Sequence, residues 1–382
     1  MSPRAAYVHV PFCRHRCGYC NFTLLAGRDD LIDDFLRAIE QELSWLGQPR
    51  PVDTLFFGGG TPTHLSPGQL DRLLVSVLRW FPLSDGGEFS IEANPSDVRP
   101  AIVDVLSRHG VTRVSLGAQS FDPAMLAILE RDHSPEEIHR AVEQLRGAVD
   151  VIGLDLIFAV PDETLDIWQS DLQTAIDLRP DHVSTYGLTF EKGTTYWSRL
   201  KRGELRQADE ELERAMYAEA IDRLTAAGLE HYEVSNFAAP GRRCRHNEVY
   251  WTGGEYFAVG PGAASHTGGV RRTNHRSTLT YLKRVLAGDS PVAETEQLPP
   301  EEKARERLVF ALRRLEGVDR RQFAEQTGFE LDELAGPALA DFVKHGMLEE
   351  HDGRIRLTRA GLFVSDGLWP SLLADQRYTA RG

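Results

Sequence analysis

The stretch AAYVHVPFCRHRCGYCNF, residues 5–22, joins an apolar run to three closely spaced cysteines. Small and β-branched residues dominate AAYVHV, and this composition predicts a buried strand. Cys13, Cys17 and Cys20 follow, separated by three and then two residues. Because so short a loop brings its thiolates around one metal centre, residues 11–22 are the predicted metal-binding loop.

Five more β-rich runs follow this strand, and amphipathic stretches separate them. They are residues 53–60, 88–94, 113–120, 151–160 and 182–190. Alternating strands and helices predict a parallel sheet. Polar residues at the strand ends favour an open or partial barrel with its chemistry at the carboxyl rim, and a doubly wound open sheet is the main alternative.

The second half of the chain has a different pattern. A further helix is predicted at 207–228, a further strand at 231–238, and helices at 301–315, 319–327 and 337–345. Asp352-Gly353 lies between two short apolar runs, which indicates a hairpin and a winged-helix-like α/β unit. We therefore predict a barrel domain at 1–235, a linker segment at 236–292 and a winged-helix-like domain at 293–382.

Charge and apolar patterning restrict the function classes. The 57 acidic and 43 basic residues give a net charge of −14, which argues against a general nucleic-acid binder. No apolar run reaches the roughly 20 residues that span a bilayer, and no signal segment is recognisable, so we expect a cytoplasmic protein. Three of the four cysteines fall within eight residues, which suits a metal site better than a disulfide framework.

Three cysteines leave one ligand position open on a four-iron cluster. A [4Fe-4S] cubane takes four protein ligands when it is closed, so one iron here would keep a free site, as a catalytic centre requires. The alternative is a structural zinc ion with His9 or His15 as its fourth ligand. Zinc sites usually pair two such motifs, and the sequence has no second pair.

With Tyr19 before its last cysteine, this spacing resembles the radical S-adenosylmethionine (SAM) superfamily. The segments YVHVPFC, FFGGGTPT, SIEANP, SLGAQSF, LERDH and LDLIFAVP resemble the family of oxygen-independent coproporphyrinogen III dehydrogenase and the haem chaperone HemW. The resemblance covers essentially the whole chain and implies a partial (β/α)6 radical SAM barrel. It also implies a [4Fe-4S] cluster on Cys13, Cys17 and Cys20, whose open iron chelates SAM.

The resemblance further implies a set of cofactor-binding residues around SAM. These are Tyr7, Tyr19, Gly59, Gly60, Thr61, Glu92, Gln119, Arg131 and Asp155. Asp155 interrupts the apolar run VIGLDLIFAV, and a buried strand rarely tolerates an unpartnered charge. Asp155 should therefore face a polar lumen; taken singly, the others are also typical of turns, caps and surface positions.

Two features separate the dehydrogenases from the chaperones. Dehydrogenases have a fourth cysteine two residues after the last cluster cysteine, where this chain has Phe22, and they carry a longer segment ahead of the cluster. Cys244-Arg245-His246-Asn247 with Tyr250-Trp251 resembles the segment proposed to bind haem in HemW. The resemblance thus implies haem-binding roles for His246, Asn247, Tyr250 and Trp251, although a structural histidine at a strand-to-loop transition fits the same pattern.

The expected function is that of a HemW-like chaperone that binds SAM and holds haem b for haem-accepting proteins. A tetrapyrrole-directed radical SAM enzyme, such as a coproporphyrinogen III dehydrogenase, is the alternative. The resemblance also implies an electron donor for the cluster, and it leaves open SAM cleavage, a homodimer and peripheral membrane association. Cys244 fits a haem thiolate, a spare thiol or a small buried residue.

Overall fold

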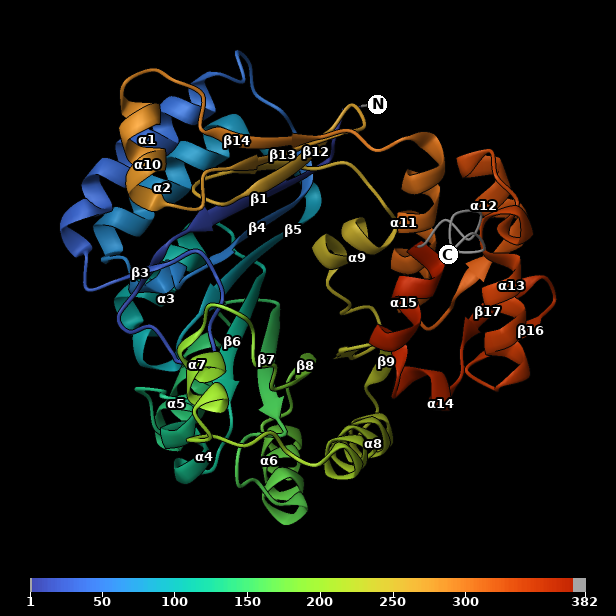
Figure 1. Cartoon of the computed structure of the whole chain (residues 1–382). Helices are drawn as coiled ribbons and strands as arrows, with labels where there is room; N and C mark the ends of the chain where they lie inside the picture. The colour runs from blue at the N-terminus through green and yellow to red at the C-terminus, as the bar shows by residue number, and fades with distance from the viewer. Residues whose placement is uncertain (1, 374–382) are drawn as a thin grey trace.

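The computed structural model describes residues 2–373 and is built around one nine-stranded sheet (Figure 1). Its six central strands run parallel and stand in chain order: β1, Ala5–Val10; β4, Val52–Gly59; β5, Leu83–Ala93; β6, Arg113–Gln119; β7, Val151–Phe158; β8, His182–Gly187. The order never reverses, as it would at the switch point of a doubly wound sheet. The predicted partial barrel is confirmed, and the doubly wound alternative is wrong.

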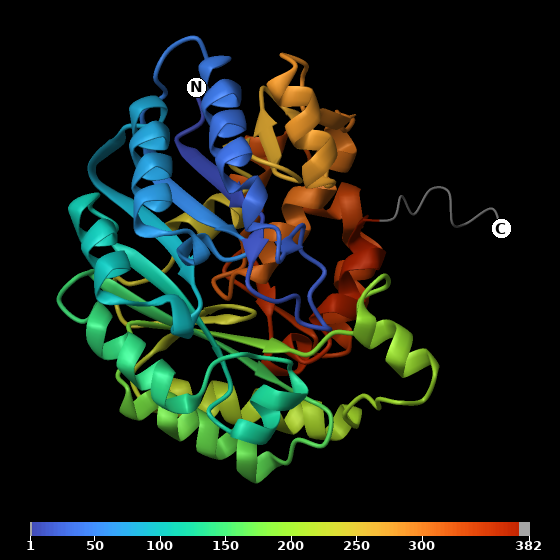
Figure 2. The ribbon, with the colours of Figure 1, turned by 90° about the vertical axis from the view of Figure 1, so that its left-hand side faces the viewer.

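Amphipathic helices cover the outer face of this curved sheet (Figure 2). They are α1, Ile32–Ser44; α2, Pro67–Trp80; α3, Pro100–Arg108; α4, Pro123–Ile128; α5, Pro135–Leu145; α6, Leu165–Asp177; and α8, Glu210–Ala226. Ser66 and Ser134 begin α2 and α5 with reciprocal capping boxes, so each helix start is fixed locally. All of these helices except α4 bury their apolar faces in a core continuous with the sheet, and α4 contributes Met125 to a second, smaller cluster.

Several short elements lie at the carboxyl rim of the barrel. They are β2, Phe12–Cys13; β3, Leu25–Ala26; α7, Thr195–Lys201; and single 3-10 turns at Asp29–Leu31, Pro62–His64 and Pro95–Asp97. Strand β2 pairs with β3, so the cysteine loop is closed at its base by two strands.

The two edges of the sheet are formed by residues from the middle of the chain. Strand β11, Phe257–Val259, adds parallel to β1, and β10, Asn236–Ala238, adds antiparallel to β8, with β9, Glu230–Glu233, beyond it. The single strand predicted at 231–238 is therefore wrong. The Glu233 carboxylate accepts a hydrogen bond from the Ser235 N–H at 2.9 Å and turns the chain into a hairpin.

A second sheet is antiparallel and lies beside the barrel. It contains β12, Ala264–Thr267; β13, Val270–Asn274; and β14, Val292–Glu296, and α10, Thr278–Leu286, packs against α1. Buried Glu42 of α1 joins these parts, because it accepts hydrogen bonds from Tyr281 Oη (2.6 Å), Asn274 Nδ2 (2.7 Å) and Gly260 N (2.9 Å). Residues 236–292, predicted as a linker, thus contribute strands to both sheets.

The C-terminal unit has the predicted winged-helix pattern. It comprises α11, Pro300–Arg313; β15, Val318–Asp319; α12, Arg320–Thr327; α13, Leu331–Lys344; β16, Leu348–His351; β17, Arg354–Leu357; α14, Arg359–Leu362; and α15, Ser365–Leu373. Helix α13 begins six residues before the predicted 337, because Pro337 lies inside a kinked helix rather than at its start. Helix α9, Arg245–Trp251, lies between the barrel and α11 (Figure 1). None of the helices in residues 2–373 combines the length and apolarity needed to cross a bilayer.

Candidate functional site

The three clustered cysteines line one cavity of about 700 Å³ at the carboxyl rim of the barrel. Cys13 Sγ lies 3.2 Å from Thr61 Oγ1, and Cys17 Sγ accepts from Arg131 Nη1 at 3.6 Å. Within residues 2–373, no three His, Cys, Asp or Glu side chains are grouped tightly enough to hold a single metal ion. A cubane distributes its cysteine ligands over separate irons, and therefore needs a wider spacing than one ion does.

Burial disfavours the thiolate form of two of the three clustered cysteines, Cys13 and Cys20. It raises the pKa of Cys13 to about 12 and also raises the pKa of Cys20. A metal centre binds the thiolate form and so reverses this preference. The donor set therefore fits an iron–sulfur cluster.

His9 lies elsewhere than the zinc alternative requires. Its Nε2 lies 2.7 Å from the Thr23 carbonyl oxygen and its Nδ1 lies 3.1 Å from Tyr7 Oη, so both ring nitrogens have partners inside the fold. His15 is half-exposed, with Nε2 3.7 Å from a Glu130 carboxylate oxygen.

The rest of the same cavity is lined by eight of the nine predicted cofactor-binding residues. These are Tyr19, Gly59, Gly60, Thr61, Glu92, Gln119, Arg131 and Asp155. Most lie at or near the carboxyl ends of β4 to β7, where a parallel barrel gathers its functional groups. Tyr7 is the exception: its side chain does not line the cavity, and its ring stacks on Phe56 at 6.1 Å between centroids.

The glycine run at the end of β4 is required by close packing within the chain. A Cβ atom on Gly59, whose φ is +111°, would lie 2.4 Å from the His9 ring, and one on Gly60 would lie 2.7 Å from the Phe12 carbonyl oxygen. These distances are too short for any other residue. The glycines therefore let the cysteine loop and β4 approach each other, which shapes the cavity wall.

Two half-buried carboxyl groups, Glu92 and Asp155, control the electrostatics of the cavity. Burial, and secondarily the neighbouring charge of Asp155, raises the pKa of Glu92 to about 7, although its Oε2 accepts from the Gly59 N–H at 2.9 Å. Burial also raises the pKa of Asp155, while hydrogen bonds from Ser184 and Ser115 oppose that shift. The cavity thus favours ligands that bring positive charge to these carboxylates.

Arg131 is held at the cysteine end of the cavity. Its Nη2 donates to Asn94 Oδ1 at 2.9 Å and to the Gly117 carbonyl at 3.2 Å. Its Nε is buried and has no acceptor among the described residues. A buried donor without an acceptor is costly, so this guanidinium fits an anionic ligand group such as a carboxylate.

Among the polar residues of this cavity that the sequence prediction missed are Asn94, Ser115 and Tyr186. Ser115 Oγ donates to the Asp155 carboxylate and lies 3.0 Å from Oδ1 and 2.9 Å from Oδ2. Ser115 and Gln119 lie four residues apart on β6, where alternate residues share a face, so strand periodicity provides a signal for Ser115.

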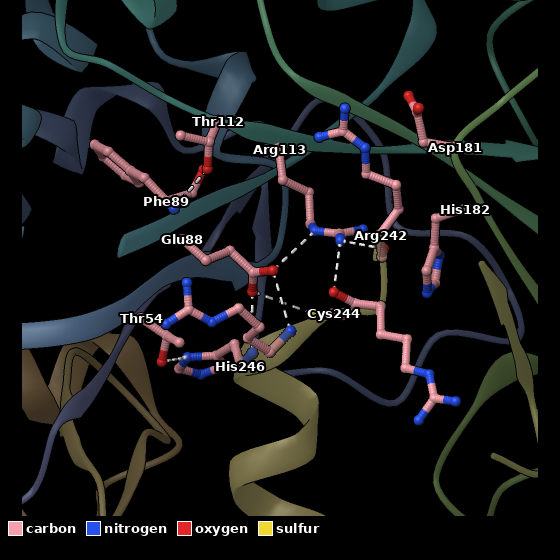
Figure 3. A network of polar contacts seen from close by, with 12 residues as sticks. Thr54, Glu88, Phe89, Thr112, Arg113, Asp181, His182, Arg242, Cys244 and His246 are labelled. Atoms are coloured by element: carbon pink, nitrogen blue, oxygen red, sulfur yellow. Dashed lines mark hydrogen bonds and ion pairs between the residues drawn. The ribbon is translucent and has the colours of Figure 1, made fainter. Parts of the chain in front are cut away.

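The segment predicted to bind haem begins at a buried ion pair (Figure 3). Glu88 of β5 accepts from the backbone N–H groups of Arg245 and His246, both at 3.0 Å, and from Arg113 Nε at 3.3 Å. Arg113 also donates to the Arg242 carbonyl at 2.6 Å. Glu88 therefore supplies the acceptors for the first turn of α9 that a capping side chain would otherwise supply.

His246 is buried, with only 1% of its surface exposed. Its Nδ1 lies 2.9 Å from Thr54 Oγ1, its Nε2 lies 2.8 Å from Tyr250 Oη, and its ring stacks on Phe56. Burial lowers its pKa to about 3. The imidazole is thus neutral, and both ring nitrogens already have protein partners.

Tyr250 and Trp251 line a second cavity of about 390 Å³, whereas His246 and Asn247 do not. This cavity lies between α9, β12, β13 and α11, and is also lined by Gly253, Gly254, Tyr256, Ala264, His266, Arg271, Lys303, Glu306, Arg307 and Phe310. Cys244 is buried, with Sγ 3.6 Å from Glu88 Oε1, so it has the position of a small buried residue.

Comparison with known proteins agrees with this geometry. The model of the radical SAM superfamily matches residues 7–175, and that of the HemN C-terminal domain matches residues 298–364. The heme chaperone HemW of Bacillus subtilis is 33% identical over 378 residues, covering 97% of this chain and 100% of the relative. HemW of Mycobacterium tuberculosis is 37% identical over 382 residues, covering 97% and 95%.

The chain belongs to the HemW family of the radical SAM superfamily. HemW of Escherichia coli is 32% identical and covers 98% of this chain and 99% of the relative. The coproporphyrinogen III oxidase HemN of Escherichia coli, a radical SAM enzyme, shares the fold, with a TM-score of 0.86, 22% identity and coverage of 97% and 90%. The HemN C-terminal domain match falls on the winged-helix-like unit, which is therefore a shared part of this family's architecture.

Membership of this superfamily implies a [4Fe-4S] cluster and SAM. The residues present fit both groups: three thiols share one cavity, glycines close its wall, and Arg131 has a buried Nε without an acceptor. Phe22, at the position where the resemblance implies a fourth cysteine in the dehydrogenases, also lines this cavity, and 65% of its surface is exposed.

Proposed function

We propose that this chain is a haem chaperone that carries a [4Fe-4S] cluster on Cys13, Cys17 and Cys20 and binds SAM beside it. The observation that carries the proposal is full-length similarity, at 32–37% identity, to relatives named heme chaperone HemW. The three cysteines and eight of the predicted SAM-binding residues line one cavity, which supports the proposal that cluster and SAM bind together. A cluster held by these three cysteines would supply one-electron chemistry beside SAM.

Each cavity residue has a role in this proposal. Arg131 binds the carboxylate of SAM, Glu92 and Asp155 receive its positive and hydroxyl-bearing parts, and Gln119 and Thr61 complete the polar wall. Tyr19 packs edge to face on Tyr196, 6.1 Å between ring centroids, and so supports the loop that carries the cluster. Tyr7 contributes indirectly, through its contact with His9.

The second part of the proposal concerns haem and its acceptors. The chain holds haem b and passes it to haem-dependent proteins, and an electron donor serves the cluster. Tyr250 and Trp251, which face the second cavity, are the residues of the predicted haem segment that favour this reading. All four cysteines are unpaired, as a reducing compartment requires, so the cytoplasm is part of the proposal.

Anaerobic reconstitution followed by titration tests both parts. We expect about four irons and four sulfides per chain, a change in the cluster spectrum on adding SAM, and a saturable Soret shift on adding haem. Haem should then transfer to a haem-free b-type cytochrome. Absence of saturable haem binding, or of transfer to the acceptor, would refute the chaperone function.

A further inference from the structure

The second cavity has the composition of a site for a flat aromatic ligand. Tyr250 and Tyr256 pack edge to face with ring centroids 4.7 Å apart, and Trp251 lies 6.2 Å from Phe310. Its volume of about 390 Å³ falls in the range of small-molecule sites, about 300–1,000 Å³. Aromatic walls with a few polar groups suit a macrocycle that presents an apolar face.

His266 of β12 is the histidine that faces this cavity. Its Nδ1 lies 3.4 Å from the Gly254 carbonyl oxygen, which accepts only a proton-bearing nitrogen. This contact places the proton on Nδ1 and leaves the lone pair on Nε2. A backbone carbonyl that fixes the tautomer in this way is typical of histidines that bind metals.

His266 and His246 differ in whether a ring nitrogen is free to bind iron. Both nitrogens of His246 have partners, Thr54 and Tyr250, so binding iron would break a buried hydrogen bond. Nε2 of His266 has no hydrogen-bond partner among residues 2–373, and the residue is half-buried at the wall of the cavity. His266 is therefore the better placed ligand.

Two cations on α11 suit the carboxylates of haem. Lys303 and Arg307 are four residues apart, so they share one face of the helix, and both line the cavity. Neither has a carboxylate within ion-pair distance in the described part of the chain; Arg307 donates to the Gln326 amide oxygen at 2.6 Å. Burial without an anionic partner lowers the pKa of Arg307.

Other charges in the cavity are already paired. Arg271 contacts Glu296 at 2.7 Å and Glu306 at 2.8 Å, so Glu306, the cavity's only glutamate as far as residues 2–373 are concerned, already has a cationic partner. The Trp251 indole N–H is buried and has no acceptor in that same range. The cavity thus offers two cations, Lys303 and Arg307, to an anionic ligand.

We propose that this cavity, between α9, β12 and α11, receives haem, with His266 Nε2 as the axial ligand of the iron and with Lys303 and Arg307 binding the two propionates. The inference rests on the proposed haem-holding function and names its site. His246 then acts as a positioning residue, because its Nε2 fixes Tyr250 at the cavity wall.

Haem titration of the full-length, cluster-reconstituted protein tests this site. Removing a group that only supports a metal ligand typically weakens metal binding by roughly 10- to 100-fold. His266→Ala removes the proposed ligand itself and should weaken haem binding by more than that. It should also abolish the optical and electron paramagnetic resonance signature of imidazole-ligated haem, and added imidazole should restore that signature. His246→Ala should weaken binding but keep the signature. The matched control, His351→Ala, alters a histidine on the exposed wing and should change neither.

The propionate contacts have their own test. Lys303→Gln and Arg307→Gln should each weaken haem binding about tenfold, as expected for a charge-assisted hydrogen bond, and should leave binding of haem dimethyl ester unchanged. Arg321→Gln, which alters an exposed arginine on α12, is the control. Cluster absorbance and SAM binding report correct folding of every variant.

The outcomes separate the two proposals. If the unmodified protein binds no haem saturably, the chaperone function fails. If it binds haem and His266→Ala keeps both the affinity and the imidazole signature, the site is wrong and the function stands. If haem and its dimethyl ester lose affinity equally in the Lys303 and Arg307 variants, the propionate assignment is wrong.

Discussion

The raised pKa of Glu92 makes SAM binding depend on pH. Burial and the charge of Asp155 bring this pKa to about 7 before SAM binds. SAM carries a positive sulfonium group, and positive charge near a carboxylate favours its ionised form. SAM should therefore bind to the ionised Glu92 side chain, and protonation should compete with binding.

The size of the effect follows from that pKa. When the ligand binds only the ionised form, the apparent dissociation constant grows by one plus the ratio of protonated to ionised Glu92. With a pKa of about 7, that factor is about 1.1 at pH 8, about 2 at pH 7 and about 11 at pH 6. SAM should thus bind about tenfold more weakly at pH 6 than at pH 8, a difference near 1.4 kcal/mol.

Equilibrium SAM titration of the reconstituted protein at pH 6, 7 and 8 and constant ionic strength measures this slope. Glu92→Gln should bind more weakly at pH 8 and lose most of the slope. Asp155→Asn should keep the slope but move it to lower pH, because it removes the charge that helps to raise the Glu92 pKa. The reasoning would be refuted if the dissociation constant for SAM changed by less than about twofold between pH 6 and pH 8. It would also be refuted if Glu92→Gln showed the same pH dependence as the unmodified protein.

The same pKa affects stability in the absence of SAM. The folded state keeps the Glu92 proton up to about pH 7, whereas an exposed glutamate loses it near pH 4.5. The stabilisation from this proton is therefore complete below about pH 4.5 and disappears as the pH rises through about 7. Glu92→Gln should remove this component from the pH profile of unfolding.

Three further predictions concern the framework. Glu88→Ala removes the carboxylate partner of buried Arg113 and should lower the free energy of unfolding by about 3–5 kcal/mol; a loss below about 1 kcal/mol in denaturant titrations would contradict this. Glu42→Ala leaves three buried donors without their acceptor and should lower the free energy of unfolding by about 3 kcal/mol or more. The measurement is the thermal unfolding midpoint, and an unchanged midpoint would contradict the stabilising role of these hydrogen bonds. Cys17→Ser should lose most iron and sulfide after reconstitution, whereas Cys244→Ser should keep them; equal contents would contradict the cluster assignment.

Local patterns were sufficient for most of the barrel. Each central strand is a short apolar run, and its register is set by burial on both faces, so the run is visible without knowing its neighbours. Asp155 stood out for the same reason, since a charge inside such a run needs a polar partner. The structure provides that partner in Ser115, one strand away.

Contacts between distant segments were not predictable in this way. His246 is buried by Thr54, which is 192 positions away, and by Phe56, so nothing in its neighbourhood in the sequence indicates that both ring nitrogens have partners. The turn at Ser235 depends on a hydrogen bond to the Glu233 carboxylate, and the surrounding residues have a strand-like pattern that gives no sign of a turn. His266 lies in a glycine-bounded stretch without periodicity, so it becomes a candidate only once β12 is seen beside α9 and α11.

Strand β4 borders the cysteine cavity and is linked to the second cavity only indirectly, through His246 and Tyr250. Thr54 and Phe56 contact His246 near the start of this strand, while Gly59 lines the cysteine cavity at its end. The two cavities share no lining residue, so haem in the second cavity would not replace SAM at the cluster. Binding at the two sites should therefore separate by mutation: Glu92→Gln should weaken SAM and spare haem, and His266→Ala should do the reverse. If either substitution weakened both ligands equally, the two cavities would have to be one coupled site, and the division of roles along β4 would be wrong.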